Sequence, residues 1–268
     1  MVSSFHLVLV RPWPFLFSLM VWRLLVARLF WFHYSCVMFF ILKMVLMRIV
    51  LLLWLRDVEI ETWLGYHTLS VYSGIRIGII LFIVSEVFFF FRFFWRYFHN
   101  CLRPRVKVVR WPSYNFEHII IKPFGLPLLN TVLLLSSGVR ITYCHHRIMI
   151  RNRKGVFYGF IITLLYGFLF LDVQFEEYQL RKFSVKRMVY GTVFFLLTGF
   201  HGFHVILGMI MIMYCFFRFF FKREFSHKQH VSFEVAAWYW HFVDVVWLFL
   251  FVLVYWYGYD SYYEDCVM

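Results

Sequence analysis

One carboxyl group, Glu86, interrupts an otherwise apolar segment in the first half of the chain. If this segment is helical, Phe82, Ile83 and Phe90 share the face of Glu86, and no basic residue lies within one turn on that face. Because desolvation disfavours the charged form of a carboxyl group, we expect Glu86 to be protonated. The simpler alternative is a neutral carboxyl group that is hydrogen-bonded to a neighbouring helix and has no role in proton transfer.

Two pairs of histidines have spacings at which metal ligands occur. His201 and His204 are three residues apart, and His145 and His146 are adjacent. A metal site needs further ligands in a fixed geometry and groups that orient them, and neither pair has a cysteine or carboxylate at a helpful spacing. We therefore expect these histidines to form hydrogen bonds between helices, and we expect no metal site.

The segment Phe233–Trp256 is long enough to cross a bilayer, yet it contains three ionisable residues. Such residues are costly in lipid, so they usually face protein or water. On a helix Glu234 and His241 project within one sector, and Asp244 lies one turn beyond His241. This pattern predicts a polar seam that packs against other helices. The residues expected in such helix-packing contacts are His201, His204, Glu234, His241 and Asp244.

The composition indicates a membrane protein. Hydrophobic residues make up 63% of the 268 residues and charged residues only 15%, whereas soluble domains are about 45–50% apolar and about 25% charged. The formal net charge of +13 favours contact with anionic lipid. Nucleic acid is not an expected partner, because the aromatic residues lie in apolar segments and do not alternate with a basic groove.

Hydropathy predicts an all-α membrane protein of about seven transmembrane helices, in a single domain over residues 1–268. Gly191, Thr198 and Gly202 share one face of the sixth span, which predicts close helix packing there. The expected spans are Trp13–His33, Cys36–Leu55, Gly74–Phe98, Phe124–Tyr143, Val156–Phe175, Met188–Phe217 and Ser232–Tyr257.

Several segments resemble, in order, those of the cytochrome c oxidase subunit 3 family. Phe233–Trp256 resembles the last helix of that family and Tyr190–Gly208 its sixth helix. Upstream, Trp54–Thr62, Ile80–Phe90 and Leu126–His146 match in the same order. The resemblance implies a two-helix part over residues 1–56 and a five-helix bundle over residues 74–258, around a V-shaped lipid cleft.

The resemblance also implies a function. The chain would be a core subunit of respiratory complex IV in the mitochondrial inner membrane, which transfers electrons from cytochrome c to oxygen and pumps protons. Haem a and copper would belong to subunits 1 and 2, so no catalytic residue or cofactor is expected in this chain. The expected partners are those subunits, accessory subunits, and cardiolipin or other phospholipids. The alternatives are subunit III of a quinol oxidase and a purely structural membrane scaffold.

Individual residues match functional positions of the family. The resemblance assigns to Glu86 the carboxyl group that reacts with carbodiimide beside the lipid cleft. Basic and hydrogen-bonding residues near membrane–water boundaries match positions that contact phospholipid headgroups, although ordinary snorkelling of helix-end side chains is the alternative. These lipid-binding candidates are Glu61, His67, Trp95, Arg218, Lys222 and His230.

The first two spans depart from the family pattern by being basic. Arg23 and Arg28 interrupt the first span, and Lys43 and Arg48 interrupt the second. Cations facing acyl chains are costly. We expect at least two of the four to be covered by acidic or hydroxyl-bearing side chains of accessory subunits.

Overall fold

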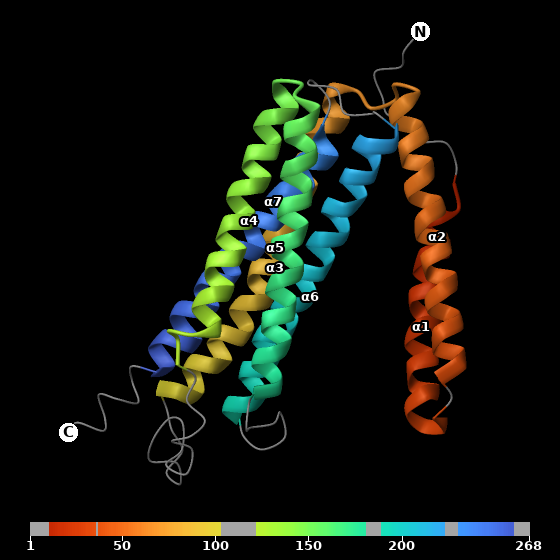
Figure 1. Cartoon of the computed structure of the whole chain (residues 1–268). Helices are drawn as coiled ribbons and strands as arrows, with labels where there is room; N and C mark the ends of the chain where they lie inside the picture. The colour runs from red at the N-terminus through yellow and green to blue at the C-terminus, as the bar shows by residue number, and fades with distance from the viewer. Residues whose placement is uncertain (1–10, 36, 103–121, 181–188, 223–229, 260–268) are drawn as a thin grey trace, which may run out of the picture. The chain divides into compact units, whose positions relative to one another are not determined.

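The structure is a computed structural model that describes residues 11–35, 37–102, 122–180, 189–222 and 230–259. Within these ranges every regular element is helical (Figure 1). The helices are α1 (Trp13–Tyr34), α2 (Val37–Trp63), α3 (Leu69–Leu102), α4 (Leu126–Met149), α5 (Arg153–Leu180), α6 (Val189–Phe217) and α7 (Val231–Leu250). Two π-helical segments, Arg218–Lys222 and Phe251–Trp256, continue α6 and α7.

The chain divides into two compact units, residues 1–77 and 78–268, with the boundary inside α3. The N-terminal unit contains α1 and α2, and it reaches further along the chain than the two-helix part expected over residues 1–56. The C-terminal unit contains most of α3 and all of α4 to α7.

In the N-terminal unit, α1 and α2 form an antiparallel hairpin (Figure 1). Pro14 lies in the first turn of α1, where its missing N–H has no helical acceptor to lose. The helix ends at Ser35, whose φ of 53° is left-handed, as is common where helices stop. At the open end of the hairpin, Trp13 Nε1 donates to Asp57 Oδ2 at 2.7 Å, and Arg11 Nη1 lies 2.6 Å from the same oxygen. These contacts connect the start of α1 to the end of α2.

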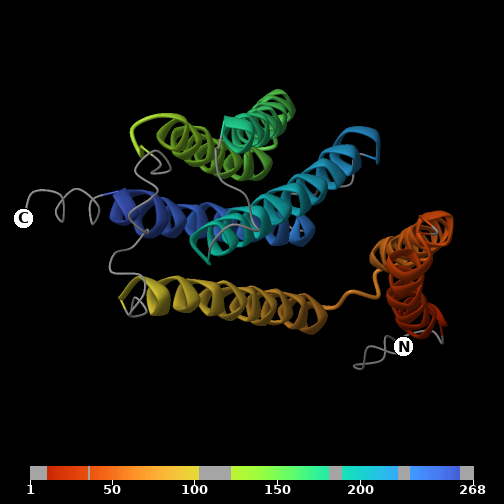
Figure 2. The same cartoon turned by 90° about the horizontal axis from the view of Figure 1, so that it is seen from below.

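In the C-terminal unit, α7 is the most deeply buried helix. Eleven of its twenty residues are buried, and the view from below places it between α3 and the α4–α5 hairpin (Figure 2). Two indoles fasten it to α4: Trp240 Nε1 donates to Ser137 Oγ at 2.9 Å, and Trp247 Nε1 donates to Thr131 Oγ1 at 3.0 Å. The polar groups of α7 and α4 therefore satisfy one another inside an apolar bundle.

The tight turn between α4 and α5 explains why these two helices pack so closely. Arg151 adopts a φ of 60°, and Asn152 caps α5 by accepting a hydrogen bond from the backbone N–H of Gly155 at 3.1 Å. A Cβ atom at Gly159 would lie only 2.8 Å from Cys144 Cβ. Glycine is thus required there for the backbones to approach.

Among the α-helices of the described residues, six of seven are long and apolar enough to cross a membrane, by length and composition, and α4 is the exception. The all-α membrane fold is confirmed, but α4 is less apolar than expected for a span over Phe124–Tyr143. The reason is that its polar residues face the protein: besides Thr131 and Ser137, Asn130 Nδ2 donates to Gln174 Oε1 of α5 at 3.3 Å.

The close contacts of α6 agree only in part with those predicted: Thr198 is buried and accepts a hydrogen bond from the hydroxyl of Tyr178 on α5, but Gly202 makes no close contact. A Cβ atom at Gly202 would have no atom within 4 Å, so the expected packing role of this glycine is wrong for the described part of the chain. Instead, a Cβ atom at Gly208 would lie 2.8 Å from Trp240 Cε3. The helical face of α6 that approaches α7 most closely is therefore the one that contains Gly208.

Candidate functional site

Glu86 pairs with a histidine from a distant part of the chain. Its Oε2 atom lies 3.0 Å from Nε2 of His204, which α6 places opposite α3. The side chain of His204 is 8% exposed and that of Glu86 23% exposed. The apolar face predicted for Glu86 on its own helix could not reveal this partner, because the two residues are 118 positions apart.

The hydrogen bond made by the second nitrogen of His204 determines how many protons the Glu86–His204 pair holds. Nδ1 lies 2.6 Å from the backbone carbonyl oxygen of Phe200. A carbonyl only accepts, so Nδ1 must carry a proton and donate it. Nε2 then either accepts from a protonated Glu86 or, as part of an imidazolium, donates to the carboxylate. In both arrangements the contact contains one proton, and Glu86 and His204 together carry no net charge.

Aromatic rings enclose His204. The ring centroid of Phe90 lies 5.0 Å from that of the imidazole, and those of Tyr239 and Phe242 both lie 6.4 Å away. These rings come from α3 and α7, so three helices contribute to the surroundings of the pair. A neutral pair suits this environment, since an uncompensated charge among aromatic rings would be strongly disfavoured.

The other residues of the expected polar seam form separate contacts. His201 Nε2 donates to the backbone carbonyl oxygen of Val243 at 3.2 Å, which joins α6 to α7. His241 Nδ1 lies 3.6 Å from Asp244 Oδ2, and its Nε2 lies 3.3 Å from the hydroxyl of Thr142 on α4. The structure thus places these ionisable side chains at helix–helix contacts, but not in one continuous row.

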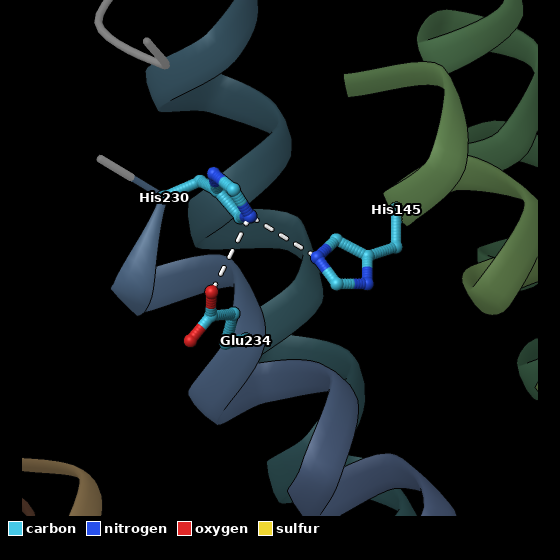
Figure 3. A group of neighbouring side chains, drawn as sticks. All are labelled: His145, His230 and Glu234. Atoms are coloured by element: carbon cyan, nitrogen blue, oxygen red, sulfur yellow. Dashed lines mark hydrogen bonds and ion pairs between the residues drawn. The ribbon is translucent and has the colours of Figure 1, made fainter. Parts of the chain in front are cut away.

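His145, His230 and Glu234 come together where α4 ends and α7 begins (Figure 3). His145 Nε2 lies 3.1 Å from His230 Nε2, and that atom lies 3.3 Å from Glu234 Oε1. The sequence pattern paired His145 with its neighbour His146 and found no nearby carboxylate. The fold supplies both a second histidine and a carboxylate from a segment more than 80 positions away.

The lipid-binding candidates are divided between the two units. In the N-terminal unit, Glu61 Oε1 lies 3.5 Å from Arg11 Nη2, and His67 Nδ1 lies 3.2 Å from the hydroxyl of Thr62. Glu61 is mostly buried, at 8% exposure. Its carboxylate therefore contributes to the open end of the hairpin, beside Asp57 and Arg11.

In the C-terminal unit, Trp95 is 64% exposed. Arg218 Nη1 donates to the hydroxyl of Ser232 at 3.2 Å, and its guanidinium lies 5.8 Å from the ring centroid of Tyr214. His230 belongs to the group with His145. The side chain of Lys222 lies outside the described residues.

Comparison with known proteins decides the family. The sequence model described as cytochrome c oxidase subunit III matches residues 3–259. The chain belongs to this family. The match includes α1 and α2, so the hairpin lies within the region that the chain shares with the family.

Relatives from several animal groups match over almost their whole length. The cytochrome c oxidase subunit 3 of Heterololigo bleekeri is 44% identical over 258 residues, which cover 96% of this chain and 98% of the relative. Those of Branchiostoma lanceolatum and Coturnix japonica are 45% and 42% identical, and cover 94% and 95% of this chain. The resemblance inferred from short motifs is confirmed.

Proposed function

We propose that this chain is a core, non-redox subunit of cytochrome c oxidase in the mitochondrial inner membrane. It packs against subunit 1, holds phospholipids and sustains turnover while the complex transfers electrons from cytochrome c to oxygen and pumps protons. Membership of the subunit III family and six helices suited to crossing a membrane support this assignment.

The observation that carries the non-redox role is how the membrane histidines of the bundle are used. His201 bonds the backbone carbonyl oxygen of Val243, His204 bonds Glu86, and His241 contacts the hydroxyl of Thr142. These contacts join α6 to α7, α6 to α3 and α7 to α4, and such use of imidazoles between helices supports the role of a packing subunit.

A small apolar hollow on the bundle supports a lipid-holding role. It has a volume of about 260 Å³ and is lined by Ile80, Ile83, Val84 and Trp238, at the junction of α3 and α7. All of these lining side chains are apolar, and those of α3 lie within the two helical turns that precede Glu86. We assign to this hollow an acyl chain of a bound phospholipid, with Glu86 at the same interface.

The assignment is tested by purifying the complex in mild detergent through a tag on this chain. Haem a and copper should co-purify, whereas the chain expressed and isolated alone should show no Soret absorption and no stoichiometric copper. Haem or copper retained by the isolated chain would contradict the non-redox role. Co-purification without any haem protein would contradict membership of the oxidase complex.

The lipid role is tested separately with Arg218→Ala. If the guanidinium at the end of α6 binds a headgroup, this variant should contain less tightly bound phospholipid by native mass spectrometry. It should also lose activity faster during sustained turnover. Arg140→Ala provides a control with an exposed arginine on α4. Unchanged lipid content and unchanged inactivation in Arg218→Ala would refute this role.

Carbodiimide labelling tests the state of Glu86. In the form in which Glu86 holds the shared proton, its carboxyl group is neutral and can react with a hydrophobic carbodiimide. We expect labelling at Glu86 in preference to Glu264, and assembly of the Glu86→Gln variant, whose amide keeps size and hydrogen bonding. Peptide mass spectrometry that found Glu264 labelled and Glu86 unlabelled would show that Glu86 is ionised.

A further inference from the structure

The group of His145, His230 and Glu234 has a hydrogen-bonding conflict at its centre. His230 Nε2 lies 3.1 Å from His145 Nε2 and 3.3 Å from Glu234 Oε1. An imidazole nitrogen offers either one N–H or one lone pair. His230 Nε2 therefore has at most one N–H for two acceptors, and it can serve both only as a shared, bifurcated hydrogen bond. A cation among the three atoms would accept a lone pair from each of them and remove the conflict.

The distances suit a metal ion. The three ligand atoms all lie within 4.8 Å of one another. Zinc binds histidine nitrogen at about 2.0–2.1 Å, so neighbouring ligand atoms of a tetrahedral site lie about 3.3–3.4 Å apart. The contacts of His230 Nε2 with His145 Nε2 and with Glu234 Oε1 are close to this spacing. A small movement of the His145 or Glu234 side chain would bring the remaining pair, His145 Nε2 and the Glu234 carboxylate, to the same distance.

The local fold holds two of the ligands in place before any ion binds. His230 precedes the first residue of α7, and Glu234 lies four positions later in its first turn, so both point along the same side of the helix (Figure 3). His145 lies near the end of α4, just before its last turn. His230 is 8% exposed, and its other nitrogen, Nδ1, has no hydrogen-bond partner among the described residues. Its Nε2 atom is therefore the nitrogen committed to this group.

We propose that His145, His230 and Glu234 form a binding site for Zn²⁺. Two imidazoles and one carboxylate are a ligand set that zinc favours, and they leave a fourth position for water or another oxygen ligand. Because the ligands come from two helices, the ion would join the end of α4 to the start of α7. The site is independent of haem and copper, so it revises only the expectation that no residue of the chain binds metal.

The test uses the intact oxidase complex, washed with a chelator and then equilibrated with Zn²⁺ by dialysis. Elemental analysis should find one more zinc per complex in the natural protein than in the His230→Asn variant. His146→Asn is the matched control, because it removes an exposed histidine adjacent to His145 but outside the group. Equal zinc contents in the natural protein and His230→Asn would overturn the proposal.

A second variant measures affinity. Glu234→Gln keeps the shape of the side chain but removes the anionic ligand, so its dissociation constant for zinc should rise at least tenfold. Loss of even an outer hydrogen-bonding partner of a metal ligand costs about 10–100-fold. An unchanged dissociation constant would exclude Glu234 as a ligand.

A measurement on the natural complex avoids reliance on variants that fail to assemble. Anomalous diffraction at the zinc edge should give a peak among the three side chains. X-ray absorption should show first-shell nitrogen and oxygen at about 2.0–2.2 Å. No peak there at saturating zinc, or a phospholipid headgroup in its place, would refute the site.

Discussion

The two units of this chain differ in where their ionisable side chains find partners. In the bundle, Glu86 contacts His204 and Asp244 contacts His241 among the packed helices. In the hairpin, the ion pairs of Arg11 with Asp57 and Glu61 lie at the open end. Farther along the hairpin, Arg23 and Lys43 have no acidic residue nearby, because α1 contains none and those of α2 all follow Arg56.

Apolar packing shows the same contrast. Eleven residues of α7 are buried, but only Ala27 is buried in α1. Large side chains of the hairpin, such as Trp22 at 67% exposure and Met38 at 74%, face away from their own unit. The difference indicates that the bundle owes its structure to its own core, while the hairpin depends on lipid or on neighbouring subunits for most of its contacts.

The largest expected effect comes from the contact of α6 with α7. A Cβ atom at Gly208 would lie 2.8 Å from Trp240, a fully buried side chain that cannot move freely. Gly208→Val should therefore destabilise the bundle by about 1–3 kcal/mol or more, as overpacked cores do. The measurement is the temperature at which the chain dissociates from the purified complex.

Gly202→Val is the matched control for this prediction, since it makes the same change on the same helix. A Cβ atom there has no atom within 4 Å, and substitutions at such positions usually change stability by less than about 0.5 kcal/mol. If both variants lowered the dissociation temperature equally, the bundle would not owe its stability to the close contact at Trp240.

The sequence was sufficient for the fold class, and insufficient for the polar contacts. Long apolar segments predicted the helices, because the bilayer imposes a fixed length and a closed hydrogen-bond pattern on each span. Local spacing could suggest that His204 bonds another helix, but it could not show that the partner is Glu86, since such contacts depend on how helices rotate and pack. The contact of His145 with His230 could not be predicted from the sequence for the same reason.

Some contacts could have been predicted from features of the sequence. Trp13 stands beside two prolines at the start of a helix, and Asp57 lies near the end of the next one. An antiparallel hairpin brings these two ends together, so the proximity of Trp13 and Asp57 follows from the helix lengths. The polar residues of α4 were a second signal, because a membrane helix that carries them must be buried against protein.

An intermediate effect on stability is expected when one member of the Glu86–His204 pair is replaced. Glu86→Leu leaves His204 Nε2 without its partner in aromatic surroundings and should destabilise the chain. The double variant Glu86→Leu/His204→Phe removes both polar groups and should recover part of the loss. We expect a coupling energy of about 1–2 kcal/mol, at the upper end for hydrogen bonds between membrane helices.

The same dissociation measurement on both single variants and the double variant gives this coupling energy. Thr142→Val offers a comparison, because its hydroxyl contacts His241 at a more exposed position. Strict additivity of the two single substitutions would mean that Glu86 and His204 do not act as one unit, and the contrast between bundle and hairpin would lose its main support.

A smaller effect is expected at the open end of the hairpin. Asp57→Asn weakens the ion pair with Arg11, but its remaining side-chain oxygen can still accept from Trp13. The result should be local fraying at the start of α1 without loss of the fold. Faster hydrogen exchange at the backbone amide of Leu16, which bonds Pro12 in the first turn, would report it. Global acceleration across α1 would instead show that this contact holds the whole hairpin.

The smallest effect on the chain itself is expected from Arg23 and Lys43. They line one hollow of about 410 Å³ between α1 and α2, whose other lining side chains include Trp22, Phe30 and Phe39. Arg23 lies midway along α1, which is about 33 Å long at 1.5 Å per residue. Its side chain is too short to reach headgroups on either side of a hydrocarbon core about 30 Å thick. We therefore expect the occupant of this hollow to be an acidic side chain from a helix of an accessory subunit.

Replacing both cations with leucine should therefore leave the bundle unchanged, because removing an unpaired charge from an apolar surface costs this chain nothing. The same change should release an accessory subunit from the complex, which mass spectrometry of the purified complex can detect. Arg48→Leu, on α2 but outside the hollow, is the control. A structure of the intact complex would distinguish an acidic partner from snorkelling more directly. If Arg23, Lys43 and the two other cations of these helices all extend to headgroups, with no partner-subunit atom within about 3.2 Å, then snorkelling explains them and the hairpin needs no acidic partner.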